Sequence, residues 1–305
     1  MSDIDTQQQI QQPEEPVFLI ERVEQTAEQP QPPRFLWLHR LAVAGAVLAL
    51  VLLALWGYRS CRHLPDLDLP LSATPEENIE KLQRGDTLTA AKETPGVVHT
   101  QDSILGVALD FYALHGVSAS LEWQEPDTLD RSVFLYCRSA DHKADSLYLG
   151  SLVVGGEEKP AYEGRLGYMA MADGRYVIGV SASDAVKDYV AERGGSFFRQ
   201  MVLLSNGVLP NDFELHGKVE RKAIARIGER YYFVVTRSKE TMWDFADALR
   251  EYGFLDAIYI TGGDNYSYYR TADGQKHDIG DVAGYPHKKW KGIIPWLVFR
   301  QSTTR

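Results

Sequence analysis

The chain has 305 residues, with 32 Lys and Arg against 42 Asp and Glu, which gives a formal net charge of −10. This excess of acid argues against a nucleic-acid binder, because such proteins need a dense basic face. Hydrophobic residues make up 44% and charged residues 24%, close to the values of globular proteins, so wholesale disorder is excluded.

The sequence carries few signals for a metal or a nucleotide. Two cysteines, Cys61 and Cys137, are too few for a four-cysteine zinc site. The histidines show no H-x-H or H-E-x-x-H spacing, and neither G-x-x-x-x-G-K-[ST] nor G-x-S-x-G occurs. We therefore expect no metal site and no cofactor. Cys61 could cross-link dimers in an oxidising compartment, whereas Cys137, inside a predicted strand, is expected to be buried.

The N-terminal residues 1–34 are rich in Gln, Glu and Pro, and this composition predicts a disordered tail, cytoplasmic in the topology given below. An apolar patch at residues 17–20 is either a docking motif for a protein partner or a sticky spot in a flexible tail.

An uncharged run follows at Leu41–Tyr58. As a helix it would be about 27 Å long, near one hydrocarbon thickness of a membrane, and Arg40 and Arg59 flank it. We therefore expect a transmembrane helix over residues 35–58, an uncleaved single-pass anchor. The N-terminus would be cytoplasmic and the C-terminal domain extracytoplasmic, periplasmic in a bacterium. A buried core helix is the alternative.

Residues 59–98 are predicted to be a stalk or linker. Within it, Thr74-Pro75-Glu76-Glu77 has the pattern of a capping box with Pro at the first helical position, which predicts a short helix to about Arg84. The remaining residues 99–305 are enough for a single core.

Strand patterns dominate residues 99–305, because short runs rich in Val, Ile, Tyr and Phe recur between turn signals. They are found at 103–109, 117–123, 132–137, 147–154, 167–172, 175–180, 222–227, 230–236, 257–261 and 296–300. Two helices are predicted, Asp184–Glu192 and Thr241–Tyr252, the second with an apolar stripe and Gly253 at its end. We expect an α+β domain with a mixed twisted sheet and few flanking helices, preceded by the transmembrane helix.

The turn Thr261–Asn265 follows a predicted buried strand and is the leading candidate for a site. Its paired glycines relax φ and let backbone amides approach a ligand, and Asp264 and Asn265 add a carboxylate and an amide. An ordinary tight turn with solvated side chains fits the same residues. The tyrosines within residues 266–269 would line a sugar-binding face or form an edge strand.

The order and spacing of several motifs within Arg193–Arg270 resemble the phosphodiester glycosidase family, which includes the enzyme that uncovers mannose 6-phosphate. The matching segments are Phe198–Leu209 with its Gln and Asn-Gly turn, Arg221–Ala225 with an arginine opening a strand, Met242–Ala246 with a Phe-Ala helix, and Ala257–Gly263 with a strand that runs into glycines. Weaker matches at Gly106–Asp110 and Ser151–Gly156 extend the resemblance to residues 103–270.

The sequence departs from the family at three places. Thr261 stands where the family strand ends in Asp, Phe134–Ala140 replaces an Asn-Gly-Gly or Asn-Ala-Gly stretch, and Arg221 is followed by Lys222-Ala223 instead of Asn-Gly. A threonine hydroxyl does not titrate in the usable range and cannot act as a general acid. The family's standard carboxylate is therefore missing at this position.

The resemblance implies cleavage of a glycosidic bond whose leaving group is a phosphodiester oxygen. Arg221 would pair with the phosphate, and Asp264 would replace the missing carboxylate, so these two are the expected catalytic residues. The expected substrate-binding residues are Gln200, Asn206, Thr261, Gly262, Gly263 and Asn265.

Taken together, the sequence predicts a membrane-anchored phosphodiester glycosidase-like protein that hydrolyses a sugar-phosphodiester bond in an envelope glycan. Its ligand would be a glycan or sugar phosphate, with no nucleic acid. The alternative is a catalytically inactive family member that serves as a carbohydrate-binding or envelope assembly module. A third hypothesis has the tail and anchor recruit partners, with the domain as a scaffold.

Overall fold

The structure is a computed structural model that describes residues 41–51, 68–84, 94–141, 147–162, 164–263, 265–280 and 293–302. Residues 1–62 and residues 63–305 form two compact units, and each is described by itself. The predicted tail at 1–34, with its apolar patch, lies outside the described residues, as does Cys61.

In the first unit, residues 41–51 form a helix. Its described part spans about 16 Å, roughly half of a hydrocarbon core. No helix in the described part of the chain is long and apolar enough to cross a membrane. The predicted transmembrane helix over 35–58 is therefore wrong, and so is the single-pass membrane localisation derived from it. Residues 35–40 and 52–58 lie outside the described part.

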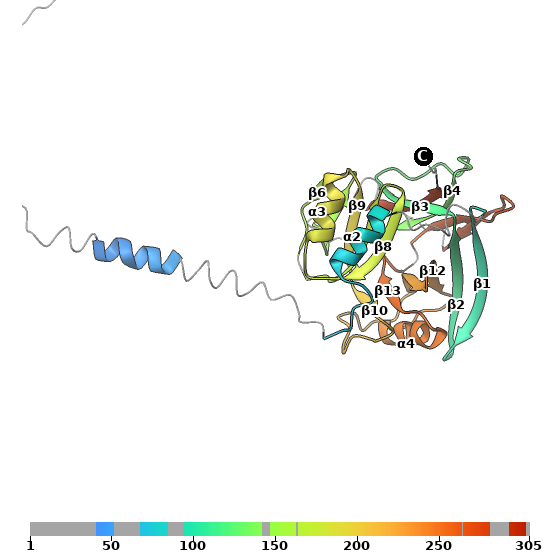
Figure 1. Ribbon diagram of the computed structural model, residues 1–305. Helices are drawn as coiled ribbons and strands as arrows, with labels where there is room; N and C mark the ends of the chain where they lie inside the picture. Colours follow the sequence, from blue (N-terminus) through green and yellow to red (C-terminus); the bar gives the residue numbers. More distant parts are fainter. Residues whose placement is uncertain are drawn as a thin grey trace, which may run out of the picture. The chain divides into compact units, whose positions relative to one another are not determined.

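The second unit contains, in its described residues, three β-sheets and three helices (Figure 1). Sheet A has the order β1 (Gly96–Ile104), β2 (Val107–His115), β12 (Arg230–Thr236), β11 (Lys222–Ile227), β13 (Asp256–Tyr259), β10 (Val202–Leu204). Sheet B has the order β15 (Lys276–Ile279), β14 (Ser267–Arg270), β4 (Val133–Arg138), β16 (Trp296–Gln301), β3 (Val117–Glu122). Sheet C has the order β6 (Glu157–Lys159), β5 (Leu152–Val154), β9 (Ser196–Gln200), β7 (Gly167–Ala172), β8 (Arg175–Val180). The helices are α2 (Pro75–Arg84), α3 (Ala185–Glu192) and α4 (Met242–Tyr252).

The predicted α+β domain with a mixed sheet is wrong, because every pair of strands in the described sheets is antiparallel. The helices explain the error. A helix between two strands suggests a parallel crossover, and α3 and α4 do link strands of the same direction. In each case, however, an opposing strand lies between them: β7 separates β8 from β9, and β11 separates β12 from β13. The fold is therefore mainly antiparallel β.

The helices themselves form where the sequence predicts them. Thr241 caps α4 by accepting a hydrogen bond from the Asp244 amide, and Gly253 ends it with a left-handed φ of 104°.

The run at 103–109, predicted as one strand, is in fact the turn of a hairpin between β1 and β2. Leu105 and Gly106 both have positive φ, 50° and 83°, as a tight hairpin turn requires, and leucine is not a residue that signals such a turn.

Three apolar clusters join the layers. The largest lies among the three sheets and includes Leu135, Met169, Ile224, Ile258 and Leu297. A second packs α4 against the other face of sheet A, and a third packs α2 and α3 against sheet C. In Figure 1, α4 accordingly lies beside β10 and β13, and α2 lies near β8.

Residues 68–84, predicted to be part of a stalk, pack onto this unit. The Ser72 hydroxyl donates to Asp256 Oδ1 at 2.6 Å, and the Asn78 amide donates to the buried Tyr168 hydroxyl at 2.7 Å. The unit therefore begins before residue 99.

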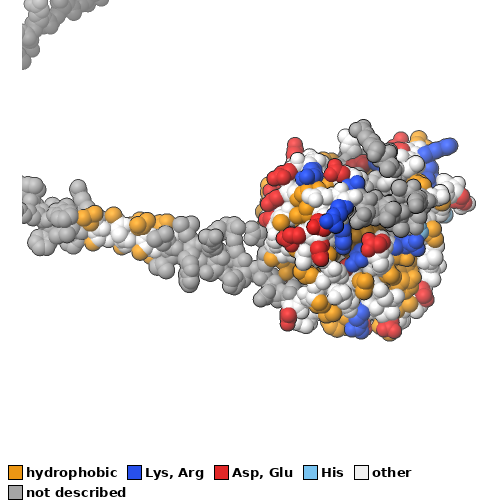
Figure 2. Space-filling model, in the orientation of Figure 1, with side chains coloured by type: hydrophobic (Ala, Val, Ile, Leu, Met, Phe, Trp, Pro, Cys, Tyr) orange, Lys and Arg blue, Asp and Glu red, His pale blue; other side chains and the backbone are white. Residues whose placement is uncertain are grey.

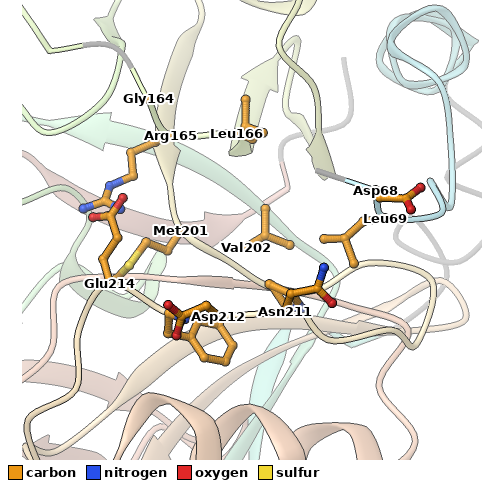
Figure 3. Close-up of a pocket in the computed structure, with 12 residues that line it drawn as sticks. Asp68, Leu69, Gly164, Arg165, Leu166, Met201, Val202, Asn211, Asp212 and Glu214 are labelled. Atoms are coloured by element: carbon orange, nitrogen blue, oxygen red, sulfur yellow. The ribbon is translucent and has the colours of Figure 1, made fainter. Parts of the chain in front are cut away.

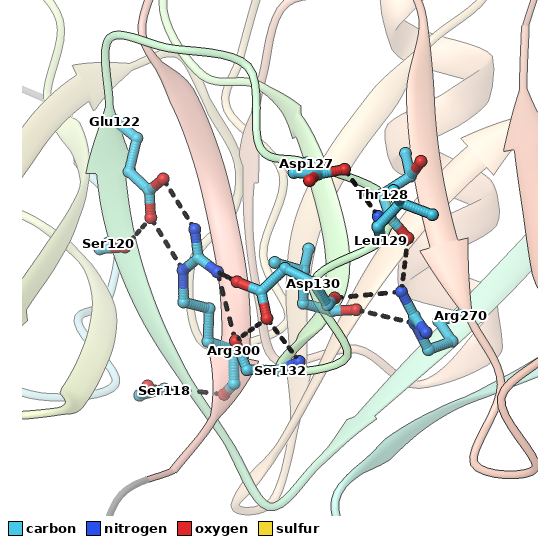
Figure 4. A network of polar contacts seen from close by, with 11 residues as sticks. Ser118, Ser120, Glu122, Asp127, Thr128, Leu129, Asp130, Ser132, Arg270 and Arg300 are labelled. Carbon is cyan, nitrogen blue, oxygen red and sulfur yellow. Dashed lines mark hydrogen bonds and ion pairs between the residues drawn. The ribbon is translucent and has the colours of Figure 1, made fainter.

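Two arginines fix the loop between β3 and β4 (Figure 4). Arg270, which is buried, donates to the carbonyls of Thr128 at 2.7 Å, Asp130 at 3.0 Å and Val133 at 3.2 Å. Arg300 is half-buried and pairs with Glu122 and with Asp130. Since loop carbonyls need donors when they are taken from water, Arg270 is the central support of this loop.

We predict that Arg270→Met lowers the free energy of unfolding by about 3 kcal/mol, because it removes a buried donor from three carbonyls. Urea unfolding of the full chain would measure the change. Arg131→Met, at an exposed position of the same loop, is the matched control and should change stability by less than about 0.5 kcal/mol. Equal effects of the two substitutions would contradict this role.

Candidate functional site

The ladder between β11 and β13 builds the candidate site. Ala223 pairs with Tyr259, and the Ile260 amide donates to the Lys222 carbonyl at 3.1 Å, so the same register continues and sets Arg221 opposite Thr261. Directly opposed residues share one face of a sheet, as do alternate residues along a strand. Arg221, Tyr259 and Thr261 therefore lie on one face, the face that α4 covers.

Arg221 is buried, with 2% of its surface exposed. Its guanidinium donates to the carbonyl of Glu240 at 2.9 Å and to that of Gly217, and it lies 5.9 Å from the centre of the Tyr259 ring. No carboxylate among the described residues lies within ion-pair distance of it. Both of these acceptors are neutral carbonyls, so within the described part of the chain no ion pair neutralises the positive charge of Arg221.

Among the described residues of this region, the Thr261 side chain has a polar atom without a hydrogen-bond partner. It is 7% exposed, and its hydroxyl is buried without a hydrogen bond among the described residues. A buried hydroxyl left unsatisfied costs roughly 1–3 kcal/mol. A hydrogen-bond partner supplied to this hydroxyl would remove that cost.

The glycine turn after Thr261 is already engaged. The Gly263 amide donates to the Glu220 carbonyl at 2.8 Å, and the Gly262 amide donates to the Tyr259 hydroxyl. The Asn265 side chain donates to the Gly262 carbonyl. Gly262, Gly263 and Asn265 are half-buried. The amides predicted to hold sugar hydroxyls thus hold the turn itself, and Asp264 lies outside the described residues.

Lys222, noted in the sequence only as a departure from the family, points to the opposite face. Its ammonium group donates to the Asn265 carbonyl and lies 3.4 Å from the Ser267 hydroxyl. It is 1% exposed and sits beside Cys137, whose pKa is raised to about 12 by burial, against the opposing effect of the Lys222 charge. Lys222 therefore holds the turn from one face of sheet A, whereas Arg221 and Tyr259 border it on the other face.

Gln200, at the end of β9, lies in the region of Tyr259 and Arg221, to which it is linked through Asp141. Its amide donates to Asp141 Oδ2 at 3.3 Å. Burial raises the pKa of the Tyr259 phenol, the Asp141 charge raises it further, and the Arg221 charge opposes both. Asp141 therefore lies within electrostatic reach of Tyr259. It is half-buried and is a carboxylate that sequence reasoning missed.

A signal for Asp141 was present in the sequence. The family's Asn-Gly-Gly stretch was expected near Val133–Ala140, and Asp141 comes directly after this segment.

Asn206 is not brought together with the others. It takes a positive φ of 49°, and its amide donates to Asp256 Oδ1 at 3.1 Å. Asp256 begins β13 whereas Thr261 follows its end, so roughly 16 Å of extended chain separates the two.

Other features of the surface bear on the ligand class. No group of three or more His, Cys, Asp or Glu residues in the described part could hold a metal ion. On the face seen in Figure 2, acidic and basic side chains are interspersed and no basic stripe forms.

Comparisons with known proteins give only a distant likeness. No protein-family model and no curated protein matches the chain. Among solved structures, it is similar to the catalytic domain of zebrafish N-acetylglucosamine-1-phosphodiester alpha-N-acetylglucosaminidase, auto-inhibited by its pro-peptide. The identity is 13%, over 68% of this chain and 83% of that one, with a TM-score of 0.47. It is also similar to a hypothetical protein from Synechocystis, at 9% identity over 67% of this chain and 62% of that one, with a TM-score of 0.40. These are remote relationships of fold, and they do not bear on activity.

We predict that Gly262→Ala disrupts the turn. An added Cβ would lie 2.7 Å from the Glu220 carbonyl oxygen and closer still to the Tyr259 hydroxyl, so backbone must shift at a cost of about 1–3 kcal/mol. Thermal unfolding would detect it. Gly217→Ala, where an added Cβ meets nothing within 4 Å, is the control, and a similar loss in both variants would refute the close packing described here.

We also predict that Cys137 resists thiol reagents. With its pKa raised to about 12 and its side chain fully buried, the thiolate that reacts is scarce at pH 8. In a Cys61→Ser chain, labelling should require denaturant. Because the raised pKa favours the protonated folded state, this group's contribution to stability is present below about pH 9 and lost as pH rises toward 12. Rapid labelling of the native chain would show that the strand opens.

Proposed function

We propose that the unit binds a sugar phosphodiester where β11 begins and β13 ends, and hydrolyses its glycosidic bond. The observation that carries the proposal is the unpaired, buried Thr261 hydroxyl opposite the uncompensated Arg221 guanidinium. The resemblance of the sequence to phosphodiester glycosidases supports the same chemistry. The substrate class is a sugar 1-phosphodiester, and no particular glycan is assigned.

Each residue has a role that its position supports. Arg221, buried and unpaired with acid, would attract the phosphate through its charge, which is weakly screened away from water. Thr261 would donate its hydroxyl to a ligand oxygen, and Gln200 would orient Asp141 through their hydrogen bond. Asn265, with the glycine turn, would border the sugar.

The reaction needs little more than a carboxylate, because a phosphodiester leaves readily without a proton. Asp141 would accept a proton from the attacking water or stabilise positive charge at the anomeric carbon. Asp264 remains proposed for the other of these two roles. Tyr259, kept protonated by its raised pKa, can donate a hydrogen bond to a developing negative charge.

A second candidate is a binding module without catalysis. The engaged amides of Gly262 and Gly263, and the two backbone carbonyls that hold Arg221, favour it. Such a site would bind a sugar phosphate without the freedom to stabilise a transition state.

We predict that Asp141→Asn lowers kcat for sugar release from a panel of sugar-1-phosphodiesters by about 100-fold or more, since general-base assistance contributes 10²–10⁴, while KM stays within about threefold. The full chain should be assayed beside Asp264→Asn and the control Asp188→Asn, an exposed carboxylate of α3.

Unchanged release in both Asp141→Asn and Asp264→Asn would rule out these carboxylates. No release by the wild-type chain, with saturable binding of a sugar phosphate that Thr261→Val weakens, would establish the binding module instead.

A further inference from the structure

A separate pocket of about 300 Å³ lies between the start of β10 and the loop at residues 210–214 (Figure 3). Leu69, Leu166, Met201 and Val202 point into its centre. Its volume is at the lower end of the range for small-molecule sites, and such sites combine an apolar lining with a few polar groups.

The polar wall of this pocket is an ion pair of unequal partners. Arg165 Nη1 lies 2.8 Å from Glu214 Oε2, with side-chain exposures of 12% and 69% respectively. Figure 3 shows the two side chains facing each other at one end of the pocket. The guanidinium is thus largely shielded from water, whereas the carboxylate that neutralises it belongs to an exposed loop residue.

This asymmetry makes Glu214 replaceable. An exposed carboxylate gains little from an ion pair, because it gives up good solvation and side-chain freedom. The Arg165 guanidinium, with its side chain 12% exposed, gains more from an anion beside it, because little water is left to solvate its charge. Another carboxylate that also fills the apolar centre would gain both the charge-assisted hydrogen bond and the hydrophobic contact.

We propose that the pocket binds an amphipathic monoanion, a carboxylate carried on a short hydrocarbon body, whose head takes the place of Glu214 on Arg165. The other acids at the pocket do not oppose this. Asp212 accepts a hydrogen bond from the Phe213 amide at 2.7 Å, and both Asp68 and Asp212 are exposed, so solvent screens their charges.

The pocket adjoins the candidate site without being part of it. The Tyr259 amide donates to the Met201 carbonyl at 2.9 Å, and Val202 pairs with Ile258, so Met201 stands opposite Tyr259. The inference goes beyond the proposed function and does not depend on it.

Calorimetric titration of the full chain with hexanoate, hexylammonium and 1-hexanol tests the proposal, because the three probes share one body and differ in the head. We expect hexanoate to bind at least about tenfold tighter than hexylammonium, the ratio that a charge-assisted hydrogen bond supports. Glu214→Gln should tighten hexanoate binding several-fold by removing the competing carboxylate. Arg165→Met should reduce hexanoate affinity to that of 1-hexanol or below.

Two controls keep the result interpretable. The Arg165 contact to Arg199 uses the backbone carbonyl of Arg165, so Arg165→Met preserves it, and an unchanged unfolding midpoint verifies folding. Asn211→Trp, at the exposed rim, should obstruct all three probes. Hexylammonium binding as tightly as hexanoate, weaker hexanoate binding in Glu214→Gln, or no hexanoate binding to either wild type or Glu214→Gln would each overturn the proposal.

Discussion

The register of β11 against β13 is the constraint on which the rest of the unit depends. Both strands are buried on both faces, with Ile224 and Ile258 in the central cluster and Ala223 and Ala257 under α4. The small residues let the helix approach, and the large ones fill the space among the sheets. A shift of one residue would exchange the two sets, so the packing of both layers fixes where Arg221 and Lys222 point.

Buried arginines recur in this fold as supports for irregular backbone. Arg221 is held by the carbonyls of residues 217 and 240, Arg270 by those of the β3–β4 loop, and Arg199 by those of Ser181 and Ser183. A guanidinium has five donors in a rigid fork, which suits several carbonyls that diverge from one loop. At the candidate site, the carbonyls satisfy donors of Arg221 without forming an ion pair with it.

Local sequence patterns were sufficient for the helices and for most strands. Thr241 and Gly253 mark the ends of α4 through their own chemistry, and alternating apolar residues mark strands such as β12. The direction of neighbouring strands could not be predicted from local patterns, because it depends on which strand lies between β12 and β13 in the sheet.

The candidate site was partly predictable for the same reason. Gln200, Arg221 and Thr261 belong to strand ends that the sequence marks, and the structure brings them to one region. Asp141 lies in the segment that follows β4 of sheet B, and only the tertiary fold places it beside Gln200. Asn206 follows an apolar run just as Gln200 precedes one, yet the direction of β10 carries it to the opposite end of the sheet.

The order of strands in sheet B has a consequence for how the protein is made. β16, the last strand of the described chain, lies between β3 and β4 and pairs with both, although these two strands are close in sequence. During synthesis, β3 and β4 emerge long before the strand that joins them, so their facing edges stay unpaired while some 150 further residues are added. Unpaired edges bind other extended chains. The nascent protein therefore has a prolonged interval in which a chaperone, or a second nascent copy, competes for the position that β16 will occupy.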